Sequence, residues 1–265
     1  EPDRVPIDFG ATRNTGVHVC VYNELRKTLN LFVKPIKVID FGQQMAEVEA
    51  EILRLFQVDV ININRVLDPC APIEIPFFKW KKWVHRCGFE VEIPDKINIV
   101  EEENRYVAYW NGNVIGFMPK KGYYFEGFNR VKPPLGDINS VSDVKNYDWS
   151  SAKISTEHLE FLKKRAEWLY KNTDYALLFF SGYAYVGGCA MGFHEWGQGL
   201  RGWAKWLADL RVRKPLAEAI LDQMMEILKY NVENIVSTLK DYVQVIAFGD
   251  DFGTEEGPQI SVEIF

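Results

Sequence analysis

Four short apolar runs, separated by helical patterns, set the expected architecture of this chain. They span Val5–Phe9, Val58–Ile63, Ala176–Phe180 and Val243–Phe248. Mainly apolar runs of this length are typical of parallel strands that are buried on both faces. The sequence therefore predicts four strands, each separated from the next by at least one helix.

The segments between these runs repeat their apolar residues at the spacing of an amphipathic helix. This spacing predicts helices over Asp40–Phe56, Thr156–Asn172 and Pro215–Leu239, with a shorter helix over Gly199–Leu210. Alternation of strands and helices predicts an α/β fold, in which helices cover both faces of a parallel sheet and the crossovers are right-handed.

Residues 67–150 interrupt this alternation. They are rich in proline and aromatic residues, and we predict that they form an insertion or cap within a single domain of residues 1–265. Within them, Arg105–Met118 is predicted to be a β-hairpin, because Asn111 and Gly112 suit a type I′ turn between two alternating strands.

Composition narrows the classes of function. The chain has 265 residues, 47% of them apolar, and a formal net charge of −6, so nothing in its charge favours nucleic acid or an anionic membrane. Residues 175–193 carry no formal charge, but their four glycines favour a strand and loop over a membrane helix. Four cysteines without a CxxC pair predict reduced thiols and a cytoplasmic protein: Cys20, Cys70, Cys87 and Cys189.

The candidate catalytic residues follow the predicted strands. Asp250 and Asp251 come directly after the fourth strand, at the end where α/β folds build their sites. Either could act as a general acid or base, or could simply cap a helix and order a loop. Arg13 follows the first strand and could hold a substrate carboxylate or form a surface ion pair.

The loop after the third strand supplies candidates for binding a substrate or cofactor. Tyr183, His194 and Glu195 are expected to line the site, and Gln259 could contact a ligand from the last segment. The same residues could instead pack beneath the loop or cap the next helix.

A His-x-Cys pair, His18 and Cys20, could hold a metal if it lies on a strand. Zinc needs at least three protein ligands, and no third ligand is close in sequence. We therefore expect a structural role for this pair, and likewise for His85 and Cys87.

The chain resembles the uroporphyrinogen decarboxylase superfamily, most closely its corrinoid-dependent methyltransferase branch. The matching segments are EPDRVPIDFGATRNTG, GFHEWGQGLRGWAKWLADLRVRKPLAEAILDQMMEIL and, the most specific of the three, DDFGTEEGPQIS. The resemblance implies a (β/α)8 TIM barrel, of which only the N-terminal part is present. The abrupt start at Glu1-Pro2-Asp3, and a helix start at Ser261 that is not continued, agree with part of a longer chain.

By this resemblance, the expected function is methyl transfer between a corrinoid (cobalamin) and a thiol or other small acceptor. A corrinoid protein is the expected partner, and zinc would activate the thiol. The family's zinc ligands would lie beyond residue 265, so no metal ligand is expected within this chain. The sequence leaves the oligomeric state open, a homo-oligomer included.

Two alternatives stay open. The first is decarboxylation of a tetrapyrrole, as in uroporphyrinogen decarboxylase itself. Where that enzyme has a paired-arginine loop, this chain has Gly10-Ala11-Thr12-Arg13, with one arginine, which counts against decarboxylation. The second is a non-catalytic half of a larger assembly, since a sheet of four strands leaves an open edge.

Overall fold

A parallel sheet forms the centre of the computed structural model, which describes residues 4–31, 34–63, 79–110, 112–126, 133–180 and 192–265. Its strands lie in the order β10 (Val245–Ala247), β9 (Ala176–Phe180) and β3 (Val60–Asn62). Asp8 joins the free side of β3 by a single parallel bridge. Three of the four predicted strands are confirmed, and the first is reduced to this bridge.

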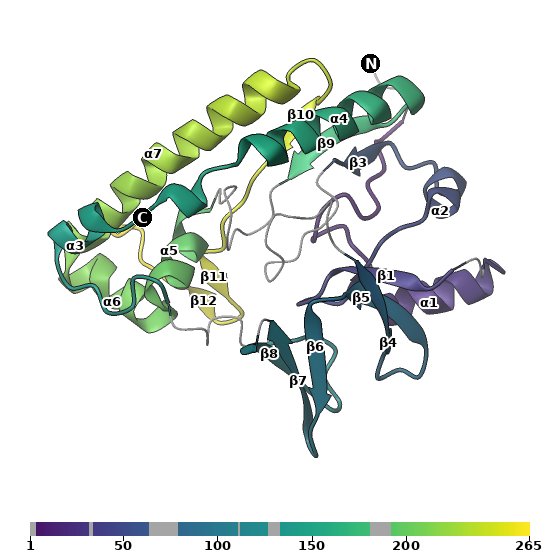
Figure 1. Cartoon of the computed structure of the whole chain (residues 1–265), viewed down its shortest axis with the longest axis horizontal. Helices are drawn as coiled ribbons and strands as arrows, with labels where there is room; N and C mark the ends of the chain where they lie inside the picture. Colours follow the sequence, from purple (N-terminus) through teal and green to yellow (C-terminus); the bar gives the residue numbers. More distant parts are fainter. Residues whose placement is uncertain (1–3, 32–33, 64–78, 111, 127–132, 181–191) are drawn as a thin grey trace.

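The predicted TIM barrel is wrong. Within the described residues the remaining strands do not extend the parallel sheet into an eight-stranded barrel. They form three separate, mostly antiparallel sheets, with the strand orders β2-β1-β5-β4, β6-β7-β8 and β11-β12. The last pair is β11 (Gly253–Thr254) and β12 (Gly257–Pro258). The molecule is a mixed α/β structure (Figure 1). Much of the chain that would form βα units in a barrel forms antiparallel hairpins instead.

Two long helices run beside the parallel sheet: α4 (Thr156–Asn172) and α7 (Lys214–Leu239) (Figure 1). Both confirm the predicted helices, because their apolar stripes are buried. Ser155 caps α4 by accepting a hydrogen bond from the His158 N–H at 3.1 Å. The single short helix predicted over Gly199–Leu210 is two helices instead. α5 (Phe193–Arg201) and α6 (Trp203–Val212) meet at Gly202, whose φ of +84° breaks the helix.

The predicted helix over residues 40–56 is largely wrong. The structure has β1 (Ile36–Asp40), β2 (Met45–Ala46) and only a short helix, α2 (Ala50–Leu55). The Asp40 carboxylate accepts the Gln43 N–H at 2.9 Å and Gln44 adopts a φ of +54°, so a turn forms where the helix was expected. Sequence periodicity also missed α1 (Val19–Thr28).

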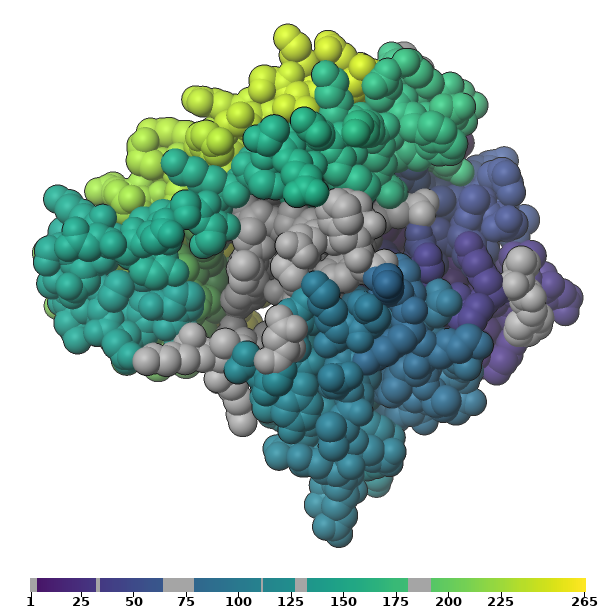
Figure 2. All heavy atoms as spheres, in the orientation of Figure 1, coloured from purple at the N-terminus to yellow at the C-terminus, as the bar shows by residue number. Residues whose placement is uncertain are grey.

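Residues 79–110 and 112–126 form two antiparallel units. β4 (Trp80–Val84) pairs with β5 (Glu90–Pro94), and β5 pairs in parallel with β1. The next three strands form a meander that projects from the lower edge of the molecule in Figure 2. The predicted Arg105–Met118 hairpin is confirmed, with Gly112 at a φ of +78° in the turn. The strands are β6 (Ile97–Glu101), β7 (Arg105–Trp110) and β8 (Asn113–Pro119).

The predicted reduced state of the cysteines is wrong for two of the four. Cys20 and Cys87 form a disulfide across a sequence separation of 67 residues. Cys70 and Cys189 lie outside the described residues. None of the described helices is both long and apolar enough to cross a membrane.

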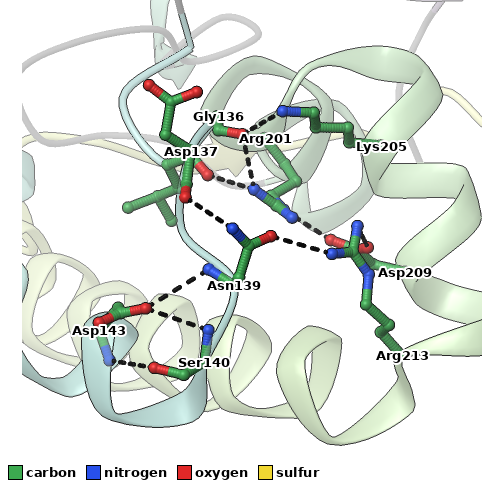
Figure 3. Close-up of polar contacts among 10 residues, drawn as sticks. Gly136, Asp137, Asn139, Ser140, Asp143, Arg201, Lys205, Asp209 and Arg213 are labelled. Carbon is green, nitrogen blue, oxygen red and sulfur yellow. Dashed lines mark hydrogen bonds and ion pairs between the residues drawn. The ribbon is translucent and has the colours of Figure 1, made fainter.

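A buried ion pair joins α5 and α6. The Arg201 Nε donates to Asp209 Oδ2 at 2.6 Å, and both side chains are fully buried. Arg201 also donates to the backbone carbonyls of Leu135 and Gly136, which tie the segment before α3 (Val141–Asn146) to these helices (Figure 3). This network fixes the position of α5, whose first turn contributes residues to the candidate site.

We predict that Asp209→Asn destabilises the protein by about 3–5 kcal/mol, because the buried Arg201 guanidinium would lose its counter-charge. Chemical denaturation measures the change. Glu226→Gln, in the exposed Lys229–Glu226 pair, is the matched control and should not change stability measurably. Equal effects of the two substitutions would contradict this account.

His158 is predicted to make stability depend on pH. Neither ring nitrogen has a hydrogen-bond partner among the described residues, and burial lowers the pKa of the ring from 6.5 to about 4. The unfolded chain therefore binds a proton that the folded chain excludes, and the stability is lost as pH falls from about 6.5 towards 4. In His158→Leu, the loss of unfolding free energy between about pH 7.5 and about pH 4.5 should shrink by about 2 kcal/mol. An unchanged loss in denaturation curves would contradict this.

Candidate active site at the carboxyl end of the parallel sheet

Charged side chains from three separate segments converge beyond the carboxyl ends of the parallel strands. Asp250 and Asp251 follow β10, and Glu195 lies in the first turn of α5, the helix that follows β9 in sequence. Arg13 follows Asp8, which pairs with β3. In parallel α/β sheets, this edge is where ligands bind.

The Asp250 carboxylate caps α5. The N-cap residue of this helix is Gly192, which has no side chain to satisfy the first backbone N–H groups. Asp250 Oδ2 accepts the His194 N–H at 2.6 Å and Oδ1 accepts the Glu195 N–H at 3.0 Å. Glycine is required at residue 192, since a Cβ there would lie 2.6 Å from the Gly249 carbonyl oxygen. The end of β10 and the start of α5 are therefore held together directly.

Glu195 has the properties of a proton-exchanging group. Burial and, after it, the negative charges of Asp250 and Asp251 together raise the pKa of its carboxyl from 4.5 to about 7, with Arg13 opposing the shift. Its Oε2 is buried and has no hydrogen-bond partner among the described residues. A carboxyl group with a pKa near neutrality can both donate and accept a proton at physiological pH.

Arg13 is already engaged by a protein carboxylate. Its Nε pairs with Asp40 at the end of β1, and the Arg13 side chain is only 9% exposed. Burial raises the pKa of Asp40, while the Arg13 guanidinium and the backbone N–H of Gln43 oppose that rise. Arg13 therefore supplies positive charge to the site from a fixed position.

The two adjacent aspartates have different environments. Asp250 is half-buried, and its carboxylate accepts hydrogen bonds from backbone N–H groups. Asp251 is exposed and accepts the Gly253 N–H at 2.9 Å. Asp250 is therefore placed to orient α5 and to tune Glu195, and Glu195 is the better candidate for proton transfer.

His194 and Gln259 form a second, mainly neutral network on the other side of the α5 start. The Trp206 Nε1–H donates to His194 Nδ1 at 3.2 Å, so His194 Nε2 carries the proton and donates to Gln259 Oε1 at 3.1 Å. Gln198 also donates to Gln259 Oε1, at 2.8 Å. Gln259, predicted as a ligand contact, thus fixes the last segment of the chain against α5.

An apolar pocket of about 420 Å³ adjoins this network. His194 lies at its wall and stacks on Phe252, with ring centroids 5.0 Å apart. Its volume is within the range of small-molecule sites. The lining is otherwise almost wholly apolar, and includes Phe193, Trp206, Leu210, Met225, Phe252 and Ile264.

Two further sequence predictions concern Tyr183 and the His18–Cys20 pair. Tyr183 lies outside the described residues. No third ligand is close to His18 and Cys20 in sequence, but the fold brings His85 beside them, with its ligand atom within 4.8 Å of theirs. The repeated His-x-Cys motif at residues 85–87 was the sequence signal for this cluster.

Comparison with protein-family models, with curated proteins and with solved structures finds no match to this chain. The residues and their geometry are therefore the basis for any functional conclusion.

We predict that Asp250→Ala destabilises the protein by about 1–2 kcal/mol, because two N–H groups at the α5 start lose their acceptor. Thermal or chemical denaturation measures this loss. Glu255→Ala, an exposed substitution in the same segment, is the control and should leave stability unchanged. An unaffected Asp250→Ala variant would show that the cap is not needed.

Proposed function

We propose that the chain contributes an enzyme active site in which Glu195 exchanges a proton with a small organic substrate. The observation that carries the proposal is the Glu195 carboxyl, with a pKa of about 7, among Asp250, Asp251 and Arg13. A structural carboxylate would be expected to find hydrogen-bond donors, whereas Oε2 of Glu195 is buried without one in the described structure.

The reaction that we propose is methyl transfer from a methylcorrinoid to a thiol or other small acceptor. The DDFGTEEGPQIS segment, which contains Asp250 and Asp251, supports this choice through its resemblance to the corrinoid-dependent methyltransferases. A methylcorrinoid held by a partner protein would supply the methyl group as an electrophile and would keep the bonding electron pair. The acceptor sulfur gains the methyl group and loses its proton. Glu195 accepts that proton, so the step is balanced.

The described residues do not fit either cofactor near Glu195. Among them, the only cluster with metal-ligand geometry is the one that contains His18, Cys20 and His85, and it does not include Glu195 or Asp250. The 420 Å³ pocket suits a small acceptor rather than a corrin ring. The corrinoid would therefore have to be presented by a partner protein, and no step is assigned to zinc here. A cytoplasmic location is part of the same proposal.

Glu195→Gln is predicted to lower the rate of methyl transfer at neutral pH by about 10²–10⁴-fold, because the general base is lost. The assay follows the loss of methylcobalamin absorbance in the presence of a panel of small thiols. In the unsubstituted protein the rate should rise as pH increases through about 7, as the Glu195 carboxyl loses its proton.

Glu255→Gln is the matched control, since Glu255 is exposed in the segment after Asp250. Equal rates for Glu195→Gln and the unsubstituted protein would remove Glu195 from the mechanism. Consumption of uroporphyrinogen, without methyl transfer to any thiol, would replace this proposal with decarboxylation.

A further inference from the structure

Two copies of one short motif meet in the fold, far from each other in sequence. His18-Val19-Cys20 and His85-Arg86-Cys87 are both His-x-Cys. His18 caps the N-terminus of α1, and Cys20 lies in its first turn. His85 and Cys87 lie in the connection between β4 and β5. We call His18, Cys20, His85 and Cys87 the His/Cys cluster.

The cluster has the spacing of a metal site. The ligand atoms of His18, Cys20 and His85 all lie within 4.8 Å of one another, and Cys20 Sγ is 3.6 Å from His85 Nδ1. Cys87 is joined to Cys20 by the disulfide, with their Cα atoms 6.7 Å apart. Two sulfurs bound to one tetrahedral zinc lie roughly 3.8 Å apart, given Zn–S bonds of about 2.3 Å. Once the disulfide is reduced, small side-chain rotations can provide that separation.

The histidine rings are oriented as metal ligands usually are. The His18 Nε2–H donates to the Tyr123 carbonyl at 2.9 Å, because a carbonyl can only accept. His18 Nδ1 is therefore the nitrogen with the lone pair, which accepts the Cys20 N–H at 3.1 Å and which zinc would take in place of that bond. A ligating histidine commonly donates its other ring N–H to a carbonyl in this way.

His85 is buried and places its Nδ1 beside Cys20 Sγ. Its side chain is only 1% exposed, yet Nε2 has no hydrogen-bond partner among the described residues. Its Nδ1 accepts the Cys87 N–H at 3.2 Å, as His18 Nδ1 accepts the Cys20 N–H at 3.1 Å. The two motifs thus have the same local geometry. Because His85 Nδ1 accepts, Nε2 carries the ring proton, so Nδ1 is the nitrogen whose lone pair zinc would take in place of the Cys87 N–H.

We propose that the reduced protein binds one Zn²⁺ through His18, Cys20, His85 and Cys87. Four protein ligands make a closed Cys₂His₂ site, which is the structural rather than the catalytic type. Two thiolates and two neutral imidazoles also balance the charge of the ion, so the site carries no net charge. Because Cys87 is exposed, reductant and metal can reach the cluster.

Zinc binding requires reduction of the Cys20–Cys87 disulfide and the release of two protons. A small dithiol reduces the Cys20–Cys87 bond and becomes a disulfide itself, leaving two protein thiols. Each thiol then releases one proton as zinc binds, so two protons are released for each ion. Either form ties the start of α1 to the β4–β5 connection, by a covalent bond in one case and by the metal in the other.

The test begins with the whole protein, reduced with a dithiol, loaded with zinc and separated from free metal. We expect about one zinc per chain. Co²⁺ in place of zinc should give the absorption of a tetrahedral site with thiolate-to-cobalt charge transfer. Loss of an outer-shell partner of a metal ligand lowers metal affinity by roughly 10–100-fold. Removal of a direct ligand should lower zinc affinity by more than this in each of three variants: Cys20→Ser, Cys87→Ser and His85→Gln.

Cys70→Ser and Cys189→Ser are the matched controls and should bind zinc normally. Circular dichroism checks that each variant is folded, and the cobalt spectrum of His18→Gln tests the fourth ligand without removing a thiol. Reduced protein that binds no zinc would overturn the proposal. So would zinc bound equally well by a folded Cys20→Ser, Cys87→Ser double variant, since this would mean an adventitious ion elsewhere.

Discussion

The contact between the Asp250 carboxylate and the first N–H groups of α5 is the constraint on which the candidate site depends. It joins the end of β10 to a helix that has no cap of its own, and Gly192 allows the close approach that it needs. The same contact places a negative charge beside Glu195. One hydrogen-bonded carboxylate thus serves both the packing of α5 and the acidity of the neighbouring carboxyl.

The buried Arg201–Asp209 pair supports this arrangement from the other end of α5. It holds α5 against α6 and against the backbone at residues 135–136. Gly197 lets the Trp206 ring pack on α5, because a Cβ there would lie 2.2 Å from that ring. The first turn of α5 therefore has a defined position, and an active-site carboxyl needs a defined position to act efficiently.

Sequence periodicity correctly predicted the helices and strands in which local sequence preference and tertiary packing agree. α4, α7 and β9 match their predicted ranges closely, since strong periodicity, a Ser155 cap and an uninterrupted apolar run agree with the tertiary packing. The helix expected at residues 40–56 failed because the chain turns after Asp40 and β2 pairs back on β1, which is itself paired with β5, more than 50 residues later; no helical period encodes these pairings. The barrel failed for the same reason, since the middle of the chain forms antiparallel hairpins.

The candidate residues divide in the same way. Asp250, Glu195 and Arg13 could be chosen as candidates from the sequence, because Asp250 and Glu195 follow strands of the parallel sheet and Arg13 follows the bridge at Asp8. The sequence shows the two motifs of the His/Cys cluster but not their proximity, because they meet only when the β4–β5 pair packs beside α1. The most direct test of the account is a carbon NMR titration of the Glu195 carboxyl, assigned by comparison with Glu195→Gln. The account predicts a midpoint at about pH 7. A midpoint at the ordinary glutamate value of about 4.3 would contradict it.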